Sequence, residues 1–276
     1  MKFCYFEHNA QIFLGVKTEK GLVKHALVSL ENLWQGEVNL TTLVNENTEI
    51  IDENDVKFLP PVLHPPKILC VGLNYARHIE ETKLTKPLEP LFFAKLPNAL
   101  AGHKGKFTIT DITPQVDYEG ELVVVIGQKG KNIPKEKALD YVLGYTIGND
   151  ITDRILQFSS SQWLRGKSLD ASAPVGPYLV TKDEVDLTKV EIITQRNGNI
   201  VQKAKLTEML FDISEIISHI SQTMTLEIGD LIFTGSPSGT IIGTAEQKRK
   251  WLTAGDIVSV TIELIGTLTT YFEKAK

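Results

Sequence analysis

The chain has 276 residues, of which 42% are hydrophobic and 23% are charged, and its formal net charge is −5. These values are ordinary for a globular protein and exclude an extended disordered chain. The acidic balance argues against a nucleic-acid partner, because affinity for phosphate backbones comes from a basic surface.

The sequence contains neither an apolar run of membrane-spanning length nor a secretory signal pattern. Its two cysteines, Cys4 and Cys70, lack the spacing of a metal-binding pair. We therefore expect a reduced, cytoplasmic protein without a membrane partner.

Residues 1–63 predict a small β-rich N-terminal domain. Their first part alternates apolar and polar residues, as half-buried strands do. The run PPVLHPPK at residues 60–67 follows, and its prolines favour an extended connector over a helix. We place the boundary there and expect one larger domain over residues 64–276.

Residues 67–83 predict a buried strand followed by a helix. The apolar run KILCVGLNY is typical of the strand, and NYARHIEETK is typical of the start of a helix. His78 and Glu81 are three residues apart on this helix and therefore share a face. Taken alone, His78 is equally explained by a structural role.

Two apolar runs carry carboxylates that a hard cation could use. Glu119 and Glu121 are two residues apart in the expected strand YEGELVVVIG, so both side chains leave the same face. Asp150 ends a second expected strand, YVLGYTIGND. Oxygen ligands favour magnesium, manganese or calcium over zinc. Salt bridges for the glutamates, and a turn or helix cap for Asp150, are the alternatives that the pattern leaves open.

A short helix or turn is expected after Asp150, and on it Arg154 and Gln157 are three residues apart. Arg154 could equally be the counter-ion of Glu119 or Glu121. Lys167 follows in an expected loop, where a surface position would also explain it.

The second half of the chain predicts more sheet and one clear helix. Asn197-Gly198 is a strong hairpin signal between two strand-like runs. The helix is expected to begin with a capping box from Asp212 to Glu215. Its apolar stripe is assigned to the core and consists of Ile213, Ile216, Ile217, Ile220 and Met224.

Two more strands are expected near the C-terminus, in LEIGDLIFTG and LTAGDIVSVTIELIG. The segment SPSGTIIGT between them is predicted to be a flexible loop. The charged run EQKRK at residues 246–250 is predicted to be a solvated face.

Six collinear motifs between residues 67 and 268 together resemble the fumarylacetoacetate hydrolase superfamily, in its acylpyruvase-like branch. The motifs are VGLNYARHIEE, PLFFAKLPNAL, DYEGELVVVIG, GYTIGNDITDR, RGKSLDASAPVGPYLVT and LEIGDLIFTGSPSG. The resemblance implies a mainly β (α+β) fold, a mixed β-sandwich roll preceded by a small β-rich N-terminal domain. It also implies a homodimer.

The resemblance further implies roles for individual residues. It implies that Glu119, Glu121 and Asp150 bind magnesium or manganese, with calcium able to replace them in crystals. It implies that His78 and Glu81 position and deprotonate a water. It implies that Lys167 contacts the substrate oxygens in a catalytic role. It also implies that the substrate is bound by Arg154, Gln157 and Ser236. Ser236 stands where relatives generally carry threonine, and the motif TDRILQ differs from the one that is usual in relatives. Substrate preference therefore stays open.

These residues predict a divalent-metal-dependent hydrolase that cleaves a C–C bond of an acylpyruvate or related 2,4-dioxo acid through a metal-stabilised enolate. The alternatives are an oxaloacetate-type decarboxylase and a 2-hydroxymuconate-type isomerase or decarboxylase. A module that binds a 2-oxo acid without turnover ranks last, because it would not need His78, Glu81 and Lys167.

Overall fold

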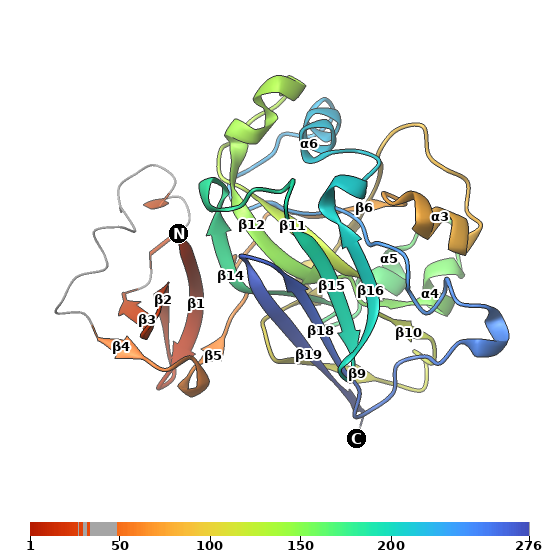
Figure 1. The fold of residues 1–276 in the computed structure, drawn as a ribbon, viewed down its shortest axis with the longest axis horizontal. Helices are drawn as coiled ribbons and strands as arrows, with labels where there is room; N and C mark the ends of the chain where they lie inside the picture. Colours follow the sequence, from red (N-terminus) through yellow and green to blue (C-terminus); the bar gives the residue numbers. More distant parts are fainter. Residues whose placement is uncertain (27, 30–31, 34–48, 276) are drawn as a thin grey trace.

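The computed structural model describes residues 1–26, 28, 29, 32, 33 and 49–275. Strands dominate these residues and form two large sheets, with short helices at the periphery (Figure 1). The expected mainly β (α+β) class is confirmed.

The larger sheet is mixed. Its strands are β1 (Lys2–His8), β2 (Gln11–Thr18), β3 (Gly21–His25), β4 (Ile50–Ile51), β5 (Lys57–Phe58), β6 (Ile68–Gly72), β7 (Leu91–Lys95), β8 (Leu100–Ala101), β11 (Gly120–Ile126), β12 (Val142–Asn149), β14 (Ala173–Thr181) and β17 (Leu231–Phe233). Their order is β4-β3-β2-β1-β14-β12-β11-β17-β6-β7, with β5 beside β1 and β8 beside β14. Strands β6 and β17 run parallel, whereas β11 and β12 run antiparallel.

The N-terminal strands continue this sheet. Strand β1 pairs antiparallel with β14, where Lys2 lies opposite Val180 and Phe3 opposite Leu179. The domain boundary at residue 63/64 stays a prediction. Part of the expected N-terminal domain, residues 27, 30–31 and 34–48, lies outside the described residues.

The second sheet packs against the first. It contains β9 (Gly105–Ile109), β15 (Glu191–Arg196), β16 (Asn199–Lys205), β18 (Ile257–Ile262) and β19 (Gly266–Lys274), in the order β16-β15-β18-β19-β9. The hairpin between β15 and β16 turns at Asn197 and Gly198, which have φ values of 51° and 80°. Positive φ at both positions suits Asn-Gly, so the predicted hairpin is confirmed.

Strand β11 lies between two apolar layers. Leu122, Val124 and Ile126 share a core cluster with Val260 and other residues of the second sheet. Their neighbours Val123 and Val125 belong to a different cluster on the opposite face. Burial on both faces explains why the run is apolar without interruption.

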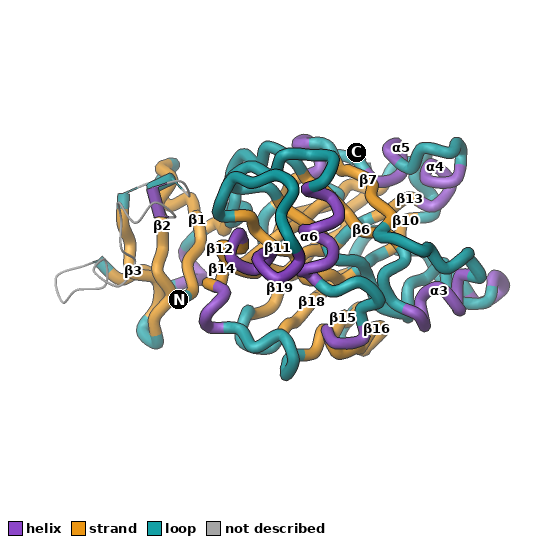
Figure 2. The backbone as a smooth tube through the Cα atoms, turned by 90° about the horizontal axis from the view of Figure 1, so that it is seen from above, coloured by secondary structure: helices purple, strands orange, loops and turns teal. Residues whose placement is uncertain are grey.

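The helices lie mostly away from the N-terminal strands. Helices α3 (Ala76–Thr82), α4 (Arg154–Phe158) and α5 (Leu164–Lys167) gather at the end opposite β1–β3 (Figure 2). The remaining elements are α6 (Ile213–Ser221), the pair β10 (Val116–Asp117) and β13 (Thr152–Asp153), and the 3₁₀ turns η1 (Glu53–Asp55), η2 (Pro97–Ala99), η3 (Lys135–Tyr141), η4 (Lys182–Glu184), η5 (Leu206–Glu208) and η6 (Glu246–Lys248). Within the described ranges, no helix has the length and apolar character needed to cross a membrane.

Helix α6 has Asp212 as its N-cap, as predicted, but it shows only this half of the predicted capping box and ends earlier. The Asp212 side chain accepts a hydrogen bond from the backbone N–H of Glu215 at 2.8 Å. The isoleucines of the predicted stripe are buried, whereas Met224 is 43% exposed. Its assignment to the core is wrong, because the helix ends at Ser221 and the helical periodicity no longer applies beyond it.

Candidate active site

Strand pairing brings three buried carboxylates together. Glu119 directly precedes β11, Glu121 lies within it, and Asp150 directly follows β12. Because β11 and β12 pair antiparallel, with Gly120 opposite Asn149, the start of one strand meets the end of the other. Oxygen atoms of the three carboxylates lie within 4.8 Å of one another.

Two lysines neutralise part of this cluster. The Lys167 Nζ lies 2.5 Å from Glu119 Oε2 and 2.5 Å from Asp150 Oδ2. The Lys95 Nζ donates to Asp150 Oδ1 at 2.6 Å. Burial lowers the pKa of Lys95, and its contact with Asp150 offsets part of that effect. Lys95 was missed in the sequence, although a lysine inside the apolar run PLFFAKL is a signal for a buried ion pair.

Glu121 is the carboxylate without a cationic partner. It accepts a hydrogen bond from the backbone N–H of Gly235 at 2.6 Å and forms no ion pair with any residue that the structure describes. Gly235 presents this N–H from a backbone with φ of 100°, a conformation that favours glycine.

The pKa values of the two glutamates shift in opposite directions. Burial, followed by the charges of Asp150 and Glu119, raises the pKa of Glu121 well above its ordinary value. Burial also disfavours the charged form of Glu119, but Arg154 and Lys167 outweigh it and hold the pKa of Glu119 below its usual range. The charged form of Glu121 therefore lacks an ion-pair partner among the described residues, and an all-oxygen donor set of this kind fits a hard divalent cation that would stabilise it.

Arg154 connects the cluster to Asp117. Its Nε and Nη2 donate to Asp117 Oδ2 at 3.0 and 2.8 Å, Nη2 also donates to Glu119 Oε1 at 2.6 Å, and Nη1 donates to Gln157 Oε1 at 3.0 Å. Of the two counter-ions left open in the sequence, the structure selects Glu119. Four of the five guanidinium donors are engaged, which leaves one for a ligand.

Asp117 was also missed in the sequence. It is fully buried, and besides Arg154 it accepts hydrogen bonds from the backbone N–H groups of Ile241 and Ile242 at 2.8 and 3.0 Å. It continues the two-residue spacing of Glu119 and Glu121, and that spacing was a signal that could have found it.

Asp117→Ala should lower the free energy of unfolding by about 3 kcal/mol or more, because it leaves the buried Arg154 guanidinium short of a partner. Urea denaturation measures this change. As a matched control, the exposed Asp111→Ala should change the free energy by no more than about 0.5 kcal/mol. Equal stabilities of the two variants would refute the structural role of Asp117.

Lys167 is the last residue of α5, so the prediction of a loop position is wrong. The reason is a close packing of α5 on α4 that the sequence pattern did not reveal. A Cβ on Gly166 would lie 2.3 Å from the backbone nitrogen of Gln157. Glycine is thus required where the two helices approach, and this approach brings Lys167 to the side of the cluster that Arg154 occupies.

His78 and Glu81 form the expected pair on α3. The His78 Nδ1 lies 2.8 Å from Glu81 Oε1. Glu81 also accepts hydrogen bonds from the backbone N–H of Gly239, at 3.1 and 2.9 Å to its two oxygens, and from Thr240 Oγ1 at 3.2 Å. The carboxylate is thereby fixed, and the Nε2 of His78 makes no hydrogen bond to a described residue.

The segment at residues 236–244, predicted to be a flexible loop, is buried or half-buried except at Thr244. Its backbone N–H groups donate to both Glu81 and Asp117. The prediction considered composition alone, whereas these side chains from distant parts of the chain satisfy the backbone of the loop. Ser236 lies here and accepts a hydrogen bond from Gln202 Nε2 at 2.8 Å.

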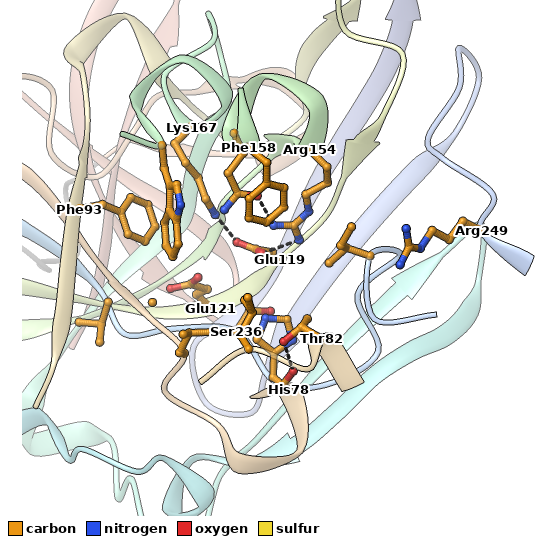
Figure 3. A pocket seen from close by; sticks show the side chains of 17 residues that line it. His78, Thr82, Phe93, Glu119, Glu121, Arg154, Phe158, Lys167, Ser236 and Arg249 are labelled. Atoms are coloured by element: carbon orange, nitrogen blue, oxygen red, sulfur yellow. Dashed lines mark hydrogen bonds and ion pairs between the residues drawn. The ribbon is translucent and has the colours of Figure 1, made fainter. Parts of the chain in front are cut away.

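A cavity of about 170 Å³, open to solvent, joins these parts (Figure 3). Glu119 and Glu121 lie in its middle, with Lys167 and Arg154 on one side and His78 and Ser236 on the other (Figure 3). Gln157 also lines the cavity, and Asp150 lies behind the lining, in contact with Lys167. The structure therefore gathers all the site residues expected from the sequence.

The charged run at residues 246–250 is only partly a solvated face. Lys248 and Lys250 are exposed, but Arg249 is half-buried and lines the cavity. The sequence pattern could not distinguish these cations, because the contact of Arg249 with the cavity depends on tertiary packing around the end of η6.

Most of the chain matches a known protein family. The sequence profile of the fumarylacetoacetate (FAA) hydrolase C-terminal family matches residues 67–273. An uncharacterised protein of Archaeoglobus fulgidus is 46% identical over 213 residues, which are 77% of this chain and 80% of that protein.

Two solved structures share the fold over both full lengths. A fumarylacetoacetate hydrolase from Exiguobacterium antarcticum is 35% identical, with a TM-score of 0.88 and 100% of each chain covered. A 5-carboxymethyl-2-hydroxymuconate delta-isomerase from Mycobacterium smegmatis is 30% identical, with a TM-score of 0.81 and 100% of each chain covered. Together with the matched profile, these likenesses show that the chain belongs to the fumarylacetoacetate hydrolase family.

Proposed function

We propose that this protein is a divalent-metal-dependent hydrolase that cleaves a C–C bond of an acylpyruvate or a related 2,4-dioxo acid. One observation carries the proposal: a cluster of three buried carboxylates, two of which line a cavity, lies between cationic side chains and a histidine paired with a glutamate. The carboxylates suit a cation, and the histidine suits a general base that acts on water.

Glu119, Glu121 and Asp150 would hold Mg²⁺ or Mn²⁺. A bound ion of this kind would polarise the oxygens of a 2-oxo acid and stabilise negative charge that develops on them. Glu121 supports the assignment, because it is the member of the trio that no lysine or arginine of the described chain neutralises.

His78 would act as the general base through Nε2. Its Nδ1 faces Glu81, so Nε2 is the nitrogen that can accept a proton from a water directed at the 4-carbonyl carbon. Attack by this water breaks the bond between C3 and C4. The 4-acyl group leaves as a carboxylic acid, and C3 takes up a proton to give pyruvate.

The remaining residues would bind and orient the substrate. Arg154 retains one free N–H donor, and Lys167 uses two of its three protons on carboxylates. Each can therefore supply one hydrogen bond to a carboxylate or keto oxygen, while Gln157 and Ser236 contribute further polar contacts from the cavity wall.

The second candidate is an isomerase or decarboxylase that acts on a 2-hydroxymuconate-type acid or on oxaloacetate. The likeness to the M. smegmatis 5-carboxymethyl-2-hydroxymuconate delta-isomerase supports it. The same metal ligands would serve this reaction, but no water would attack. The homodimer implied by the resemblance also stays a prediction.

The test is turnover of acetylpyruvate and of oxaloacetate with Mg²⁺, in parallel with a chelator. We expect acetylpyruvate to be cleaved and the chelator to abolish cleavage. Mg²⁺ at about 100 times its Kd should raise the free energy of unfolding by about 2.7 kcal/mol, measured by urea denaturation. Turnover of oxaloacetate alone would favour the decarboxylase, and no turnover of either acid by Mg²⁺-loaded protein would refute the hydrolase.

A further inference from the structure

Arg249 contributes a cation to the cavity that no acidic residue of the described chain neutralises. Its Nε donates to the backbone carbonyl of Thr244 at 3.0 Å, and its Cζ lies 6.0 Å from the centre of the Trp251 ring. These contacts orient the guanidinium but leave its Nη groups without an acceptor among the residues that the structure describes. They are therefore available to a ligand.

The position of Arg249 separates it from the carboxylate cluster. It lies on the side of the cavity opposite Phe93, beyond Arg154 and Thr82, with its guanidinium turned toward the cavity (Figure 3). Arg154 and Lys167 are already engaged with Asp117, Glu119 and Asp150, whereas Arg249 is not. The cavity thus has a cation at a second, separate place.

Apolar side chains line the rest of the cavity. They include Leu84, Phe93, Phe158, Trp163 and Ile242. An entirely apolar acyl tail would suit these residues but would leave the Arg249 donors unused. A tail with apolar methylenes and an anionic end would satisfy both, because a guanidinium matches the geometry of a carboxylate with two parallel hydrogen bonds.

We propose that Arg249 determines specificity by binding a second carboxylate, at the end of the substrate remote from its 2-oxo acid group. The substrate class is then a 2,4-dioxo dicarboxylic acid. This inference rests on the proposed function for the chemistry of the bond cleaved, but the binding preference itself does not depend on cleavage.

The experiment compares acids that differ only at the far end. The substrates are the diacid 2,4-dioxoheptanedioate and the monoacid 2,4-dioxoheptanoate. A second diacid and monoacid, each one methylene longer, test whether the result depends on chain length. For wild-type protein with Mg²⁺, kcat/KM should favour the diacid by about tenfold or more, mainly through KM.

Arg249→Gln should reduce this ratio to about one, and Arg249→Lys should retain part of it because the charge remains without the paired donors. Lys248→Gln is the matched control, since it removes one positive charge from the neighbouring exposed residue and should leave the ratio at the wild-type value. A wild-type ratio near one for both lengths, or an unchanged ratio in Arg249→Gln, would overturn the proposal.

A binding measurement keeps the outcome separate from that of the proposed function. 2-Oxoheptanedioate and 2-oxoheptanoate lack the 4-oxo group, so calorimetry with Mg²⁺ reports affinity alone. We expect wild-type protein to bind the diacid about tenfold more tightly than the monoacid. Arg249→Gln should bind the two acids with equal affinity. If no dioxo acid is cleaved, the hydrolase is refuted, while this affinity ratio still supports or overturns the role of Arg249.

Discussion

Glu121→Gln should lower Mg²⁺-dependent turnover of acetylpyruvate by at least about 100-fold, because it removes a charged metal ligand from the site. Without metal, the substitution should not lower the free energy of unfolding. Glu121 forms no ion pair with a described residue, and burial together with the charges of Asp150 and Glu119 raises its pKa, so the metal-free fold already favours an uncharged group at this position. The glutamine oxygen can still accept the hydrogen bond from Gly235.

Glu119→Gln is the informative comparison. Its Mg²⁺-dependent turnover should fall about as far as that of Glu121→Gln. Unlike that change, it also weakens ion pairs to Arg154 and Lys167. We therefore expect it to lower the free energy of unfolding of the metal-free protein by about 3 kcal/mol. Urea denaturation in chelator measures the difference between the two variants. Wild-type turnover of Glu121→Gln at limiting Mg²⁺, or equal destabilisation by both changes, would contradict the assignment.

His78→Ala should suppress hydrolysis of acetylpyruvate by about 10²- to 10⁴-fold, the usual contribution of a general base. Any decarboxylation of oxaloacetate should be affected less, because that reaction needs no activated water. His78 is paired with Glu81 and lies across the cavity from Lys167, and both observations support a role as base in hydrolysis only.

The readout that separates a catalytic from a structural role is metal binding. His78 is not one of the proposed ligands, so Mg²⁺ should stabilise His78→Ala as much as it stabilises the wild type. Glu81→Gln should give a smaller loss of hydrolysis, because His78 remains but loses the carboxylate that orients it. Equal loss of hydrolysis and decarboxylation in His78→Ala, or loss of the Mg²⁺ effect, would refute the role as base.

Local spacing was sufficient to predict the central features of the site. Glu119 and Glu121 share a face because alternate residues of a strand do so in any tertiary context. His78 and Glu81 meet because residues three apart on a helix are neighbours. The hairpin at Asn197-Gly198 follows in the same way from the φ values that these residues tolerate. Each of these depends on geometry within a few residues.

Partners from distant segments could not be predicted in this way. The contacts of Lys95 with Asp150 span 55 residues, and those of Glu81 with Gly239 span 158. Arg154 had two candidate counter-ions in the sequence, and only the tertiary structure showed that its guanidinium pairs with Glu119.

The three carboxylates of DYEGEL and GYTIGND show where this division lies. That Glu119 and Glu121 leave one face of a strand could be predicted from their spacing, because side-chain direction in a strand is a local property. Three further features became known from the folded chain: Asp150 joins the two glutamates, cations neutralise two of the three carboxylates, and Arg249 lines the same cavity. The physical reason is that strand register, helix packing and ion-pair choice are set by competition among contacts across the whole chain.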